Sequence, residues 1–460
     1  MRRSLDPDRL FAELSEFEHL AVAVSGGSDS MALLTFVSDW SLRVGVGVTA
    51  LTVDHGLRPG SRREADYVAE CCRHLGIAHH TLYWDGEKPA SGLSDAARGA
   101  RYRLLARFCA EHAITALLTG HTRDDQAETI YMRLKRSALS NRGLAGMAFE
   151  TRYRSDPLSE ITIYRPLLCH ARSALRAMLV GKGVGWIDDP TNDNTAYERV
   201  RARSLLAQSP DFAEDLIQYG RCAGRLRRLH ACQAADFIET HVRVGIGDQL
   251  FLPRAALRAL AEPVAVLTVQ ALMSVVGGRE HLPPARKVMA VLRESGRATL
   301  SRVIVTQDDT TVSLRRENRN LAGEITLSSA PQLWDGRYFL WLNVCDGRVP
   351  TVRCLRSHET ADAVVSSAMP LEGHNVKQVL ATQPMVFDAS GDFHDPSGSF
   401  HSGTTVGSVS CRHARGAFER FCPAFDLPLL DAIDGLFTRK LHPDTVKHVT
   451  KDAVWEDSNV

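Results

Sequence analysis

The stretch that decides the fold is His19–Val37, HLAVAVSGGSDSMALLTFV. It opens with an apolar run typical of a buried strand and closes with Met31–Val37, an apolar segment that we expect to lie on a helix. The residues between them, Ser25–Ser30, predict a tight loop from strand to helix. A Gly-rich loop in this setting presents unpaired backbone N–H groups and the positive end of a helix dipole to an anion. The stretch therefore predicts a phosphate-binding loop in an α/β protein.

The composition of this loop suits phosphate. Gly26 and Gly27 permit backbone torsions and a close approach that a side chain would block. Asp29 would repel phosphate unless it holds a metal ion or caps its own helix. We expect the whole loop to contact the phosphates of a nucleotide through Ser25, Gly26, Gly27, Ser28, Asp29 and Ser30. The alternative is an ordinary capped turn, because turns often use Gly, Ser and Asp. The loop lacks the lysine of a GxxxxGK[ST] motif, which disfavours a Walker-type NTPase.

Further strands follow the loop, each separated from the next by a segment of helical period. We expect strands within residues 46–56, 77–84 and 114–120, and helices within residues 61–76, 93–112 and 122–136. Strands that alternate with helices form parallel sheets. The chain thus opens as a parallel-sheet α/β domain, to which we assign residues 1–209.

The rest of the chain predicts two more domains, since 460 residues exceed the size at which one hydrophobic core keeps growing. Residues 210–299 open with Arg-rich helices and are assigned to a helical domain. From about residue 300, short segments alternate apolar and polar residues between loops rich in Gly, Ser and Asp, as antiparallel strands do. Residues 300–460 are therefore assigned to a smaller, β-rich domain.

Bulk composition excludes several classes of protein. With 44% hydrophobic and 24% charged residues, the chain has the composition of a soluble globular protein. We find neither a signal peptide nor the roughly 18 consecutive apolar residues of a membrane span, so we expect a cytoplasmic protein. The ten cysteines include no CxxC pair, which favours reduced thiols over a zinc ribbon or an iron-sulfur site. A net charge of +1 means that any basic surface must be local.

Several motifs then resemble known families. The loop SGGSDS resembles the SGGxDS signature of PP-loop ATP pyrophosphatases, which transfer AMP from ATP to a carbonyl-type oxygen. Further segments are similar, in the same order, to those of tRNA(Ile)-lysidine synthases. They are VDHGLRPGSRREADYV from Val53, AARGARY from Ala96, GHTRDDQAET from Gly120, RPLL from Arg165 and WIDDPTNDNTAYERVRAR from Trp186. The segment LWDGRYFL, from Leu333, is a weaker match.

The chain departs from the family pattern in two places. After Arg136 it reads SALSNRGLAGM where the family usually has a short Gly-rich RGSG turn. Val200 stands where the family commonly has Asn. The first departure puts the shape of the loop beside the active centre in doubt.

The segment GHTRDDQAET carries the candidate catalytic acids. Thr122 and Asp125 fit a capping box, so a structural role explains at least one acid of this first turn. Asp125 and Glu128 lie one turn apart, and with Asp29 they are the candidate ligands of Mg²⁺. The resemblance implies an amine nucleophile, lysine, that attacks an activated carbon; this amine arrives mostly protonated and needs a base near that carbon. We expect Asp125 to be that base, with Asp124 as the second choice.

Other residues are expected around the nucleotide. His121 can polarise a phosphate, and Arg101 or its neighbour Arg98 can neutralise charge on the phosphates. A structural histidine and a solvated helix face are the respective alternatives. Ligands of open α/β sheets gather at the carboxyl ends of the strands, where we expect three more residues to border the nucleotide: Asp54, His55 and Gly120.

Clusters of arginine predict the surface for tRNA, because phosphate contact needs local cation density. Any single cluster has a solvated helix face as its usual explanation. The arginines we assign to tRNA are Arg199, Arg201, Arg203, Arg225, Arg227 and Arg228. Aromatic residues available to stack on an extruded base are Tyr131, Phe149 and Tyr197.

The resemblance implies a ligase reaction at the wobble cytidine of the CAU anticodon of an isoleucine tRNA. ATP, with Mg²⁺, adenylates the C2 carbonyl oxygen and releases pyrophosphate. The ε-amine of L-lysine then attacks C2 and expels AMP, which changes codon specificity from AUG to AUA. The sequence does not decide between a monomer and a homodimer.

Three rival functions stay open. A tRNA thiolase of the same superfamily delivers sulfur through cysteine pairs, which this chain lacks. An amidotransferase synthetase needs a nucleophilic cysteine at its start, where this chain has Arg2. A tRNA-binding protein without catalysis is favoured only by the altered turn after Arg136.

Overall fold

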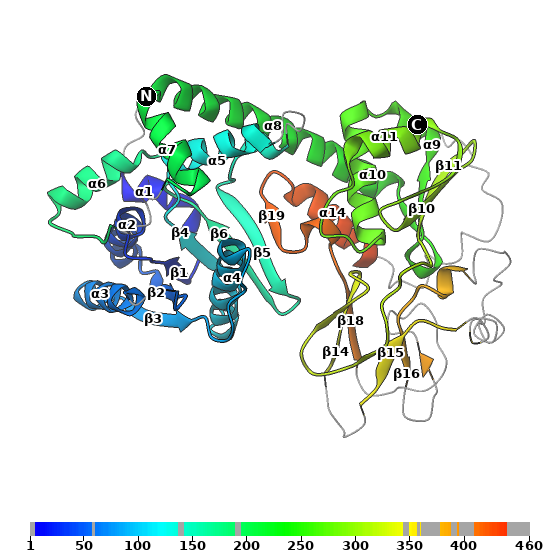
Figure 1. The fold of residues 1–460 in the computed structure, drawn as a ribbon, viewed down its shortest axis with the longest axis horizontal. Coiled ribbons are helices and arrows are strands. Elements are labelled where there is room, and N and C mark those ends of the chain that lie inside the picture. The colour runs from blue at the N-terminus through cyan, green and yellow to red at the C-terminus, as the bar shows by residue number, and fades with distance from the viewer. Residues whose placement is uncertain are drawn as a thin grey trace. The chain divides into compact units, whose positions relative to one another are not determined.

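The computed structural model describes residues 5–57, 60–136, 142–188, 195–343, 349–356, 359, 378–387, 393–394 and 409–438 (Figure 1). The chain forms two compact units. The first comprises Met1–Arg228 and the short segment Arg420–Phe425, and the second comprises Leu229–Glu419 and Asp426–Val460. The three-domain division at residues 209 and 299 stays a prediction. The chain leaves the first unit inside helix α8 (Pro210–His241), beyond the predicted boundary at residue 209.

A seven-stranded sheet of order β19-β5-β6-β4-β1-β2-β3 forms the centre of the first unit. Neighbouring strands from β6 to β3 run parallel, whereas β5 and β19 add an antiparallel edge. The strands are β1 (His19–Ala23), β2 (Gly47–Asp54), β3 (Ala78–Tyr83), β4 (Ala116–Thr119), β5 (Glu150–Asp156), β6 (Ser159–Tyr164) and β19 (Phe421–Pro423). The predicted parallel α/β fold is confirmed, while the β5–β6 hairpin and β19 were not predicted.

Helices cover both faces of this sheet (Figure 1). Because strand side chains alternate between faces, Leu20 and Val22 of β1 enter one core with α2, and Ala21 enters the other with α4. The helices of this unit, in chain order, are α1 (Pro7–Leu10), η1 (Ala12–Leu14), α2 (Ser28–Val44), α3 (Ser61–His74), α4 (Leu93–Glu111), α5 (Arg123–Arg136), η2 (Gly143–Ala145), α6 (Arg172–Gly181), α7 (Glu198–Gln208) and most of α8. The predicted helices thus lie where the helical period placed them.

The second unit is mixed. Its helices are α9 (Arg254–Ala259), α10 (Glu262–Val276), α11 (Ala285–Arg293) and α14 (Leu427–Thr438), with η4 (Ile246–Asp248) and η5 (Gly416–Phe418). A five-stranded antiparallel sheet, β7-β8-β11-β10-β9, joins β7 (Arg243–Val244), β8 (Leu250–Pro253), β9 (Gly296–Leu300), β10 (Val303–Gln307) and β11 (Thr311–Arg316). Residues 210–299, predicted to be helical, therefore also contain short strands, whose few residues give little periodic signal.

Two small antiparallel sheets complete the second unit and confirm its β-rich character. One is β12 (Ile325–Thr326), β15 (Thr351–Arg353), β16 (Met385–Phe387) and β17 (Phe393–His394). The other is β13 (Gln332–Trp334), β14 (Tyr338–Leu342) and β18 (Val409–His413).

A charged cluster lies inside this second unit. The Asp335 carboxylate, with a fully buried side chain, accepts hydrogen bonds from Arg316 Nε at 3.0 Å and Arg337 Nε at 2.8 Å, and it also pairs with Arg302. Burial acts to raise the pKa of Asp335, but the arginines hold it below its usual value. The LWDGRYFL segment therefore supplies two members of a buried ion cluster.

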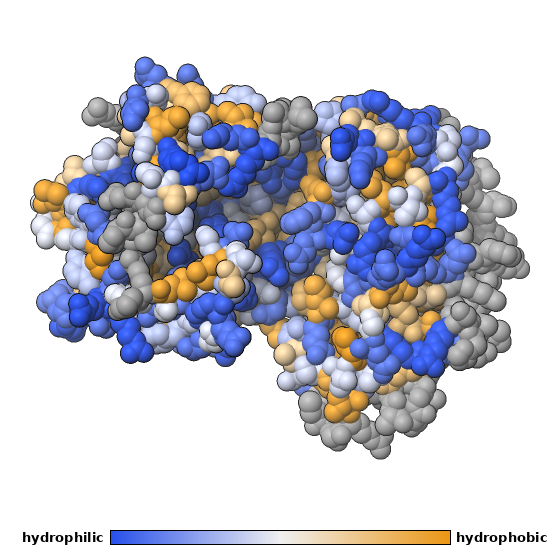
Figure 2. Space-filling view, in the orientation of Figure 1, coloured by the Kyte–Doolittle hydropathy of each residue, from blue (hydrophilic) through white to orange (hydrophobic). Residues whose placement is uncertain are grey.

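Among the described residues, no helix is long and apolar enough to cross a bilayer. On the face shown in Figure 2, hydrophilic residues cover most of the surface and hydrophobic residues form small separate groups. The cysteines of the described ranges are all free thiols.

Candidate active site

The loop between β1 and α2 has the geometry of an anion site. Gly26 has φ +84°, which favours glycine, and a Cβ there would lie 3.1 Å from Ile187 Cδ1. Gly27, with ordinary φ −71°, is the N-cap residue of α2, and a Cβ there would be in ordinary van der Waals contact with its nearest neighbour, Ser25 Oγ, at 3.7 Å. The first turn of α2 lines the cavity with Ser28, Asp29 and Ser30, where its backbone N–H groups favour an anion.

Hydroxyl groups hold this loop in place. Ser30 Oγ donates to the Gly27 carbonyl at 3.0 Å and accepts from the Ser25 N–H at 3.1 Å. Ser30 therefore fixes the loop, while Ser28 Oγ accepts from Arg176 Nε at 3.1 Å. Ser28 is thus the loop serine with a cationic neighbour.

The capping box predicted at the start of α5 is present. Asp125 Oδ2 accepts from the Thr122 N–H and the Thr122 hydroxyl, both at 2.8 Å, and the Asp125 N–H approaches Thr122 Oγ1 at 3.4 Å. Asp124 has a different partner, because its Oδ2 accepts from the backbone N–H of Arg172 at 2.8 Å and so caps helix α6. Both acids therefore cap helices, Asp125 at α5 and Asp124 at α6, in addition to any role in catalysis.

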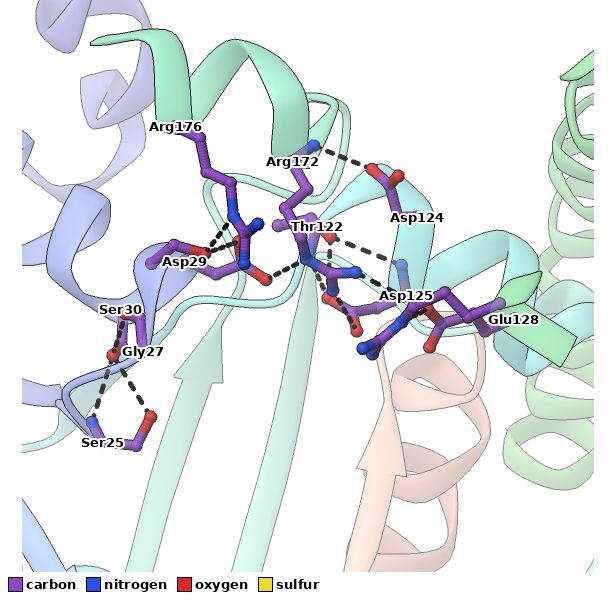
Figure 3. Close-up of polar contacts among 12 residues, drawn as sticks. Ser25, Gly27, Asp29, Ser30, Thr122, Asp124, Asp125, Glu128, Arg172 and Arg176 are labelled. Carbon is purple, nitrogen blue, oxygen red and sulfur yellow. Dashed lines mark hydrogen bonds and ion pairs between the residues drawn. The ribbon is translucent and has the colours of Figure 1, made fainter. Parts of the chain in front are cut away.

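Arg172 joins the phosphate loop to α5, as Figure 3 shows. Its Nε donates to Asp29 Oδ2 at 2.7 Å and its Nη2 to Asp125 Oδ1 at 3.1 Å, while its Nη1 lies 3.7 Å from Glu128. Although burial opposes the charged form, these acids raise the pKa of Arg172. The guanidinium therefore stays charged at the centre of the site.

Two arginines of α7 extend this cluster. Arg199 donates to Asp125 Oδ1 at 2.8 Å and to Glu128 Oε2 at 2.6 Å, and Arg203 donates to Glu128 Oε1 at 2.8 Å. The Glu128 side chain is only 2% exposed, so both of its oxygens are committed to arginine. Arg199 and Arg203, predicted for tRNA, thus contact the acids of α5. We call these six residues the cavity cluster: Asp29, Asp125, Glu128, Arg172, Arg199 and Arg203.

The surroundings shift the pKa values of Asp29 and Asp125 in opposite directions. Burial, only partly offset by Arg172, raises the pKa of Asp29. Burial also acts to raise the pKa of Asp125, but Arg172, Arg199 and the Thr122 N–H hold it below its usual value. Asp125 is therefore the more firmly ionised of the two acids.

Mg²⁺ binding by Asp29, Asp125 and Glu128 stays a prediction. Within the described ranges no group of three or more His, Cys, Asp or Glu side chains is placed to hold a metal ion. Each of the three acids accepts a hydrogen bond from an arginine, and Asp125 also caps α5. Asp29 differs in lying at the phosphate loop, where a carboxylate fits an ion held mainly by phosphate oxygens.

His121 lies on the cavity, and its Nδ1 is 3.0 Å from Thr119 Oγ1. Burial first, and the charge of Arg165 second, lower the pKa of His121 to about 3. The ring is therefore neutral at physiological pH and cannot neutralise phosphate charge as a cation. Gly120 beside it approaches α2 so closely that a Cβ would lie 2.9 Å from the Asp29 carbonyl oxygen.

Arg101 lies on the cavity, while His55 stands behind it. Arg101 Nη2 is 3.2 Å from His55 Nε2. Burial and the charge of Arg101 lower the pKa of His55 to about 4, so the neutral ring accepts from the guanidinium. Asp54 Oδ1 accepts from the Gly56 N–H at 2.8 Å and so also serves the turn after β2. Neither Asp54 nor His55 lines the cavity.

The remaining predicted tRNA contacts are divided. Arg201 donates to the carbonyls of Thr195 and Ala196, and Arg228 donates to Ala424 O at 3.1 Å. Arg227 lies 5.5 Å from the Phe425 ring and donates to Arg142 O at 3.0 Å. Of the three α8 arginines predicted to contact tRNA, exposed Arg225 has one hydrogen bond to a described residue, to Cys222 Sγ at 3.8 Å.

The aromatic candidates for base stacking are also divided. Tyr131 packs on Phe212, and Phe149 packs on Tyr164. Tyr197, just before α7, is 54% exposed. Residues 137–141 of the altered turn and residues 189–194 of the WIDDPTNDNTAYERVRAR segment lie outside the described ranges.

One cavity of about 830 Å³ brings these parts together. That volume lies toward the upper end of the roughly 300–1,000 Å³ found for small-molecule sites. Its polar side includes the phosphate loop, Asp125 and five arginines, of which two, Arg172 and Arg176, were not predicted. Sequence reasoning missed Arg172, Arg176, Ile187 and Asp188, since an arginine on a short helix looks like a solvated face. The polar and apolar lining includes Ser25, Gly27, Ser28, Asp29, Ser30, Leu51, Val53, Arg101, Tyr102, Leu105, Gly120, His121, Asp125, Arg172, Arg176, Arg199 and Arg203.

Comparison with known proteins agrees with this geometry. A family model described as a PP-loop domain matches residues 5–209. The tRNA(Ile)-lysidine synthase of Mesorhizobium japonicum is 37% identical over 439 residues, which cover 92% of this chain and 93% of that one. The Rhizobium meliloti enzyme of the same name is 33% identical over 458 residues, with 93% and 94% coverage. The Brucella canis enzyme is 32% identical over 454 residues, with 95% and 98% coverage.

These matches extend through both compact units, well beyond the phosphate loop, and the PP-loop domain accounts for the ATP-using site. The motifs, the fold and nearly full-length similarity agree, and the chain belongs to the tRNA(Ile)-lysidine synthase family.

Proposed function

We propose that the chain ligates L-lysine to C2 of the wobble cytidine in the CAU anticodon of tRNA(Ile), with ATP as co-substrate. The observation that carries the proposal is one cavity lined by a phosphate loop, arginines and Asp125 of α5. An adenylating ligase needs these three parts within reach of one reacting carbon. The product reads AUA in place of AUG.

In the first step the C2 carbonyl oxygen of cytidine attacks the α-phosphorus of ATP, and pyrophosphate leaves with the electron pair of the broken P–O bond. The α2 N-terminus and its loop hold the phosphates. We assign to Arg176, which contacts Ser28, and to Arg172, which contacts Asp29, the neutralisation of negative charge on the leaving group. Mg²⁺ entering with ATP would be held by Asp29 and would neutralise phosphate charge.

In the second step the lysine ε-amine attacks C2, and AMP leaves. The attacking nitrogen must lose protons, so a base must lie near C2. We assign this part to Asp125, since it lines the cavity and is ionised, whereas Asp124 caps α6. The acids Asp125 and Glu128 now hold arginines, and a lysine ammonium is a cation that can take an arginine's place.

The test is incorporation of radiolabelled lysine into a tRNA(Ile) transcript with ATP, with AMP and pyrophosphate measured in the same samples. We expect one lysine, one AMP and one pyrophosphate per modified tRNA. A transcript with U in place of the wobble C is the matched control and should accept none. Sulfur or no group transferred, with ATP consumed, would contradict the proposal.

A further inference from the structure

The edge strand of the sheet in the first unit, β19, comes from a segment near the C-terminal end of the chain. Strand β19 pairs antiparallel with β5, with Phe421 opposite Tyr153. The Arg154 N–H donates to Arg420 O at 3.0 Å, and the Ala424 N–H donates to Glu150 O at 2.9 Å. The residues on either side of Arg420–Phe425 belong to the second unit. A six-residue segment is thus inserted into the sheet of the catalytic unit.

The side chain that this segment inserts is Phe421. Its ring lies 5.1 Å from Tyr102, nearly perpendicular at 83°, and 4.6 Å from Tyr153. The two tyrosine rings are themselves 5.4 Å apart. Arg98 covers this group, with its guanidinium 5.1 Å from the Tyr102 ring and 5.9 Å from the Phe421 ring. Edge-to-face rings fix one another's orientation as well as burying apolar area.

Tyr102 connects this aromatic group to the reaction. It lines the cavity and is only 3% exposed, so its ring has little freedom apart from what its neighbours allow. With Leu51, Val53 and Leu105 it forms an apolar part of the wall, distinct from the phosphate loop and its arginines. A flat base suits such a wall, because ligand sites combine apolar contact area with a few oriented polar groups.

We propose that Phe421 is a positioning residue that holds Tyr102 in the cavity wall against a nucleobase, either the adenine of ATP or the wobble cytosine. The inference rests on the proposed function for the identity of the base. By this inference the segment Arg420–Phe425 contributes to the active site, although the segment lies more than 200 residues after the sequence motifs of the first unit.

The test uses the full-length chain with Phe421→Leu, which keeps apolar volume but loses the ring, and Phe421→Tyr, which keeps the ring. The matched control is Phe11→Leu in the opposite core, where a fully buried Phe11 packs 5.2 Å from Trp40. Equilibrium dissociation constants for ATP and for tRNA(Ile) are measured separately, together with thermal unfolding. Binding is measured without turnover, so a protein that binds both but ligates no lysine would contradict the proposed function alone.

We expect both leucine variants to unfold at lower temperature, and only Phe421→Leu to weaken binding, by about two- to tenfold. A weaker ATP complex would identify adenine as the base, and a weaker tRNA complex would identify cytosine. Phe421→Tyr should restore the wild-type constant. Unchanged binding of both ligands by Phe421→Leu, or an equal loss in Phe11→Leu, would overturn the inference.

Discussion

Each unit of the molecule contains a cluster in which three arginines surround acids, yet the two clusters differ in access. In the second unit Asp335, Arg316 and Arg337 have side chains that are at most 1% exposed. In the cavity cluster Arg199 and Arg203 keep 43% and 35% of their side-chain exposure. The same pairing chemistry therefore occurs both where water is excluded and where side chains line a cavity.

The partners of the arginines explain this difference. In the buried cluster the guanidinium groups also donate to backbone carbonyls, such as Arg316 to Arg319 and Asn320. The N–H groups of these guanidiniums therefore already have acceptors within the protein, some of them backbone carbonyls that cannot be displaced without unfolding. In the cavity cluster Arg172 and Arg199 donate mainly to carboxylates. A substrate anion can replace such a carboxylate, and a substrate cation can replace such an arginine. An arginine network with only side-chain partners can reorganise at the cost of ion pairs alone.

The largest effect should come from the phosphate loop, which only the cavity cluster has beside it. Gly27→Val should abolish lysine incorporation, because the branched side chain enters the space of the phosphates while the backbone, at φ −71°, accepts it. Gly181→Val, at a glycine with open space around its Cβ, is the control and should stay active. Wild-type turnover by Gly27→Val would show that the loop does not bind phosphate.

Asp125→Asn separates the chemical steps. If Asp125 accepts the proton of lysine, the variant should release pyrophosphate but lose lysine incorporation by roughly 10²- to 10⁴-fold. If a cap is its whole role, both steps should survive with a stability loss of about 1 kcal/mol. Asp124→Asn, measured alongside, should weaken only the cap of α6. Near-normal rates in both variants would remove these acids from the mechanism.

Asp335→Asn should show the opposite pattern. Removing the charge leaves Arg302, Arg316 and Arg337 without their shared anion, which typically destabilises a protein by about 3–5 kcal/mol. We expect a lower thermal midpoint and lower urea resistance, with ATP affinity per folded molecule unchanged. Asp125→Asn, in the more open cluster, should lose less stability than Asp335→Asn. Equal losses would mean that exposure does not distinguish the clusters.

Mild acid should lower the stability of the first unit through two buried histidines beside the cavity cluster, before the buried cluster of the second unit titrates. His55 and His121 have folded-state pKa values of about 4 and about 3, well below the ordinary 6.5, so their stabilising contribution is complete above pH 6.5 and is lost as pH falls toward those values. Asp335, with its lowered pKa, titrates only in stronger acid. The urea midpoint should therefore fall between pH 7.5 and pH 5, and the fall should be smaller in a His55→Gln, His121→Gln double variant.

Asp29 acts in the opposite sense, because a raised carboxyl pKa means that the folded state takes up the proton first. The double variant keeps Asp29, so the difference from wild type isolates the histidines. An identical pH dependence in both proteins would contradict the neutral, buried state of these rings.

The sequence predicts what depends on neighbouring residues. The strands and helices from His19 to Arg136 follow from local periodicity, and the Thr122–Asp125 capping box follows from spacing within one turn. Strand β19 could not be found this way, because Phe421 and Tyr153 pair across most of the chain. Arg172 was missed for a similar reason, because its partners Asp29 and Asp125 are distant in sequence and contact it only in the folded chain.

The arginines of α8 give the smallest and last expected effect, since they belong to neither cluster. Arg225 is exposed, and no carboxylate of the described residues pairs with it, so its charge is available to a phosphate. Arg227 and Arg228 instead contact the inserted segment, so replacing them would change both tRNA binding and stability.

We therefore expect Arg225→Gln to weaken tRNA binding and to flatten its salt dependence by up to about 0.9 log units, the share of one phosphate contact. Arg107→Gln is the control, because Arg107 is as exposed but pairs with Glu111 on the same helix. If Arg225→Gln leaves the salt dependence of tRNA binding unchanged, Arg225 is an ordinary solvated residue and does not contact a phosphate.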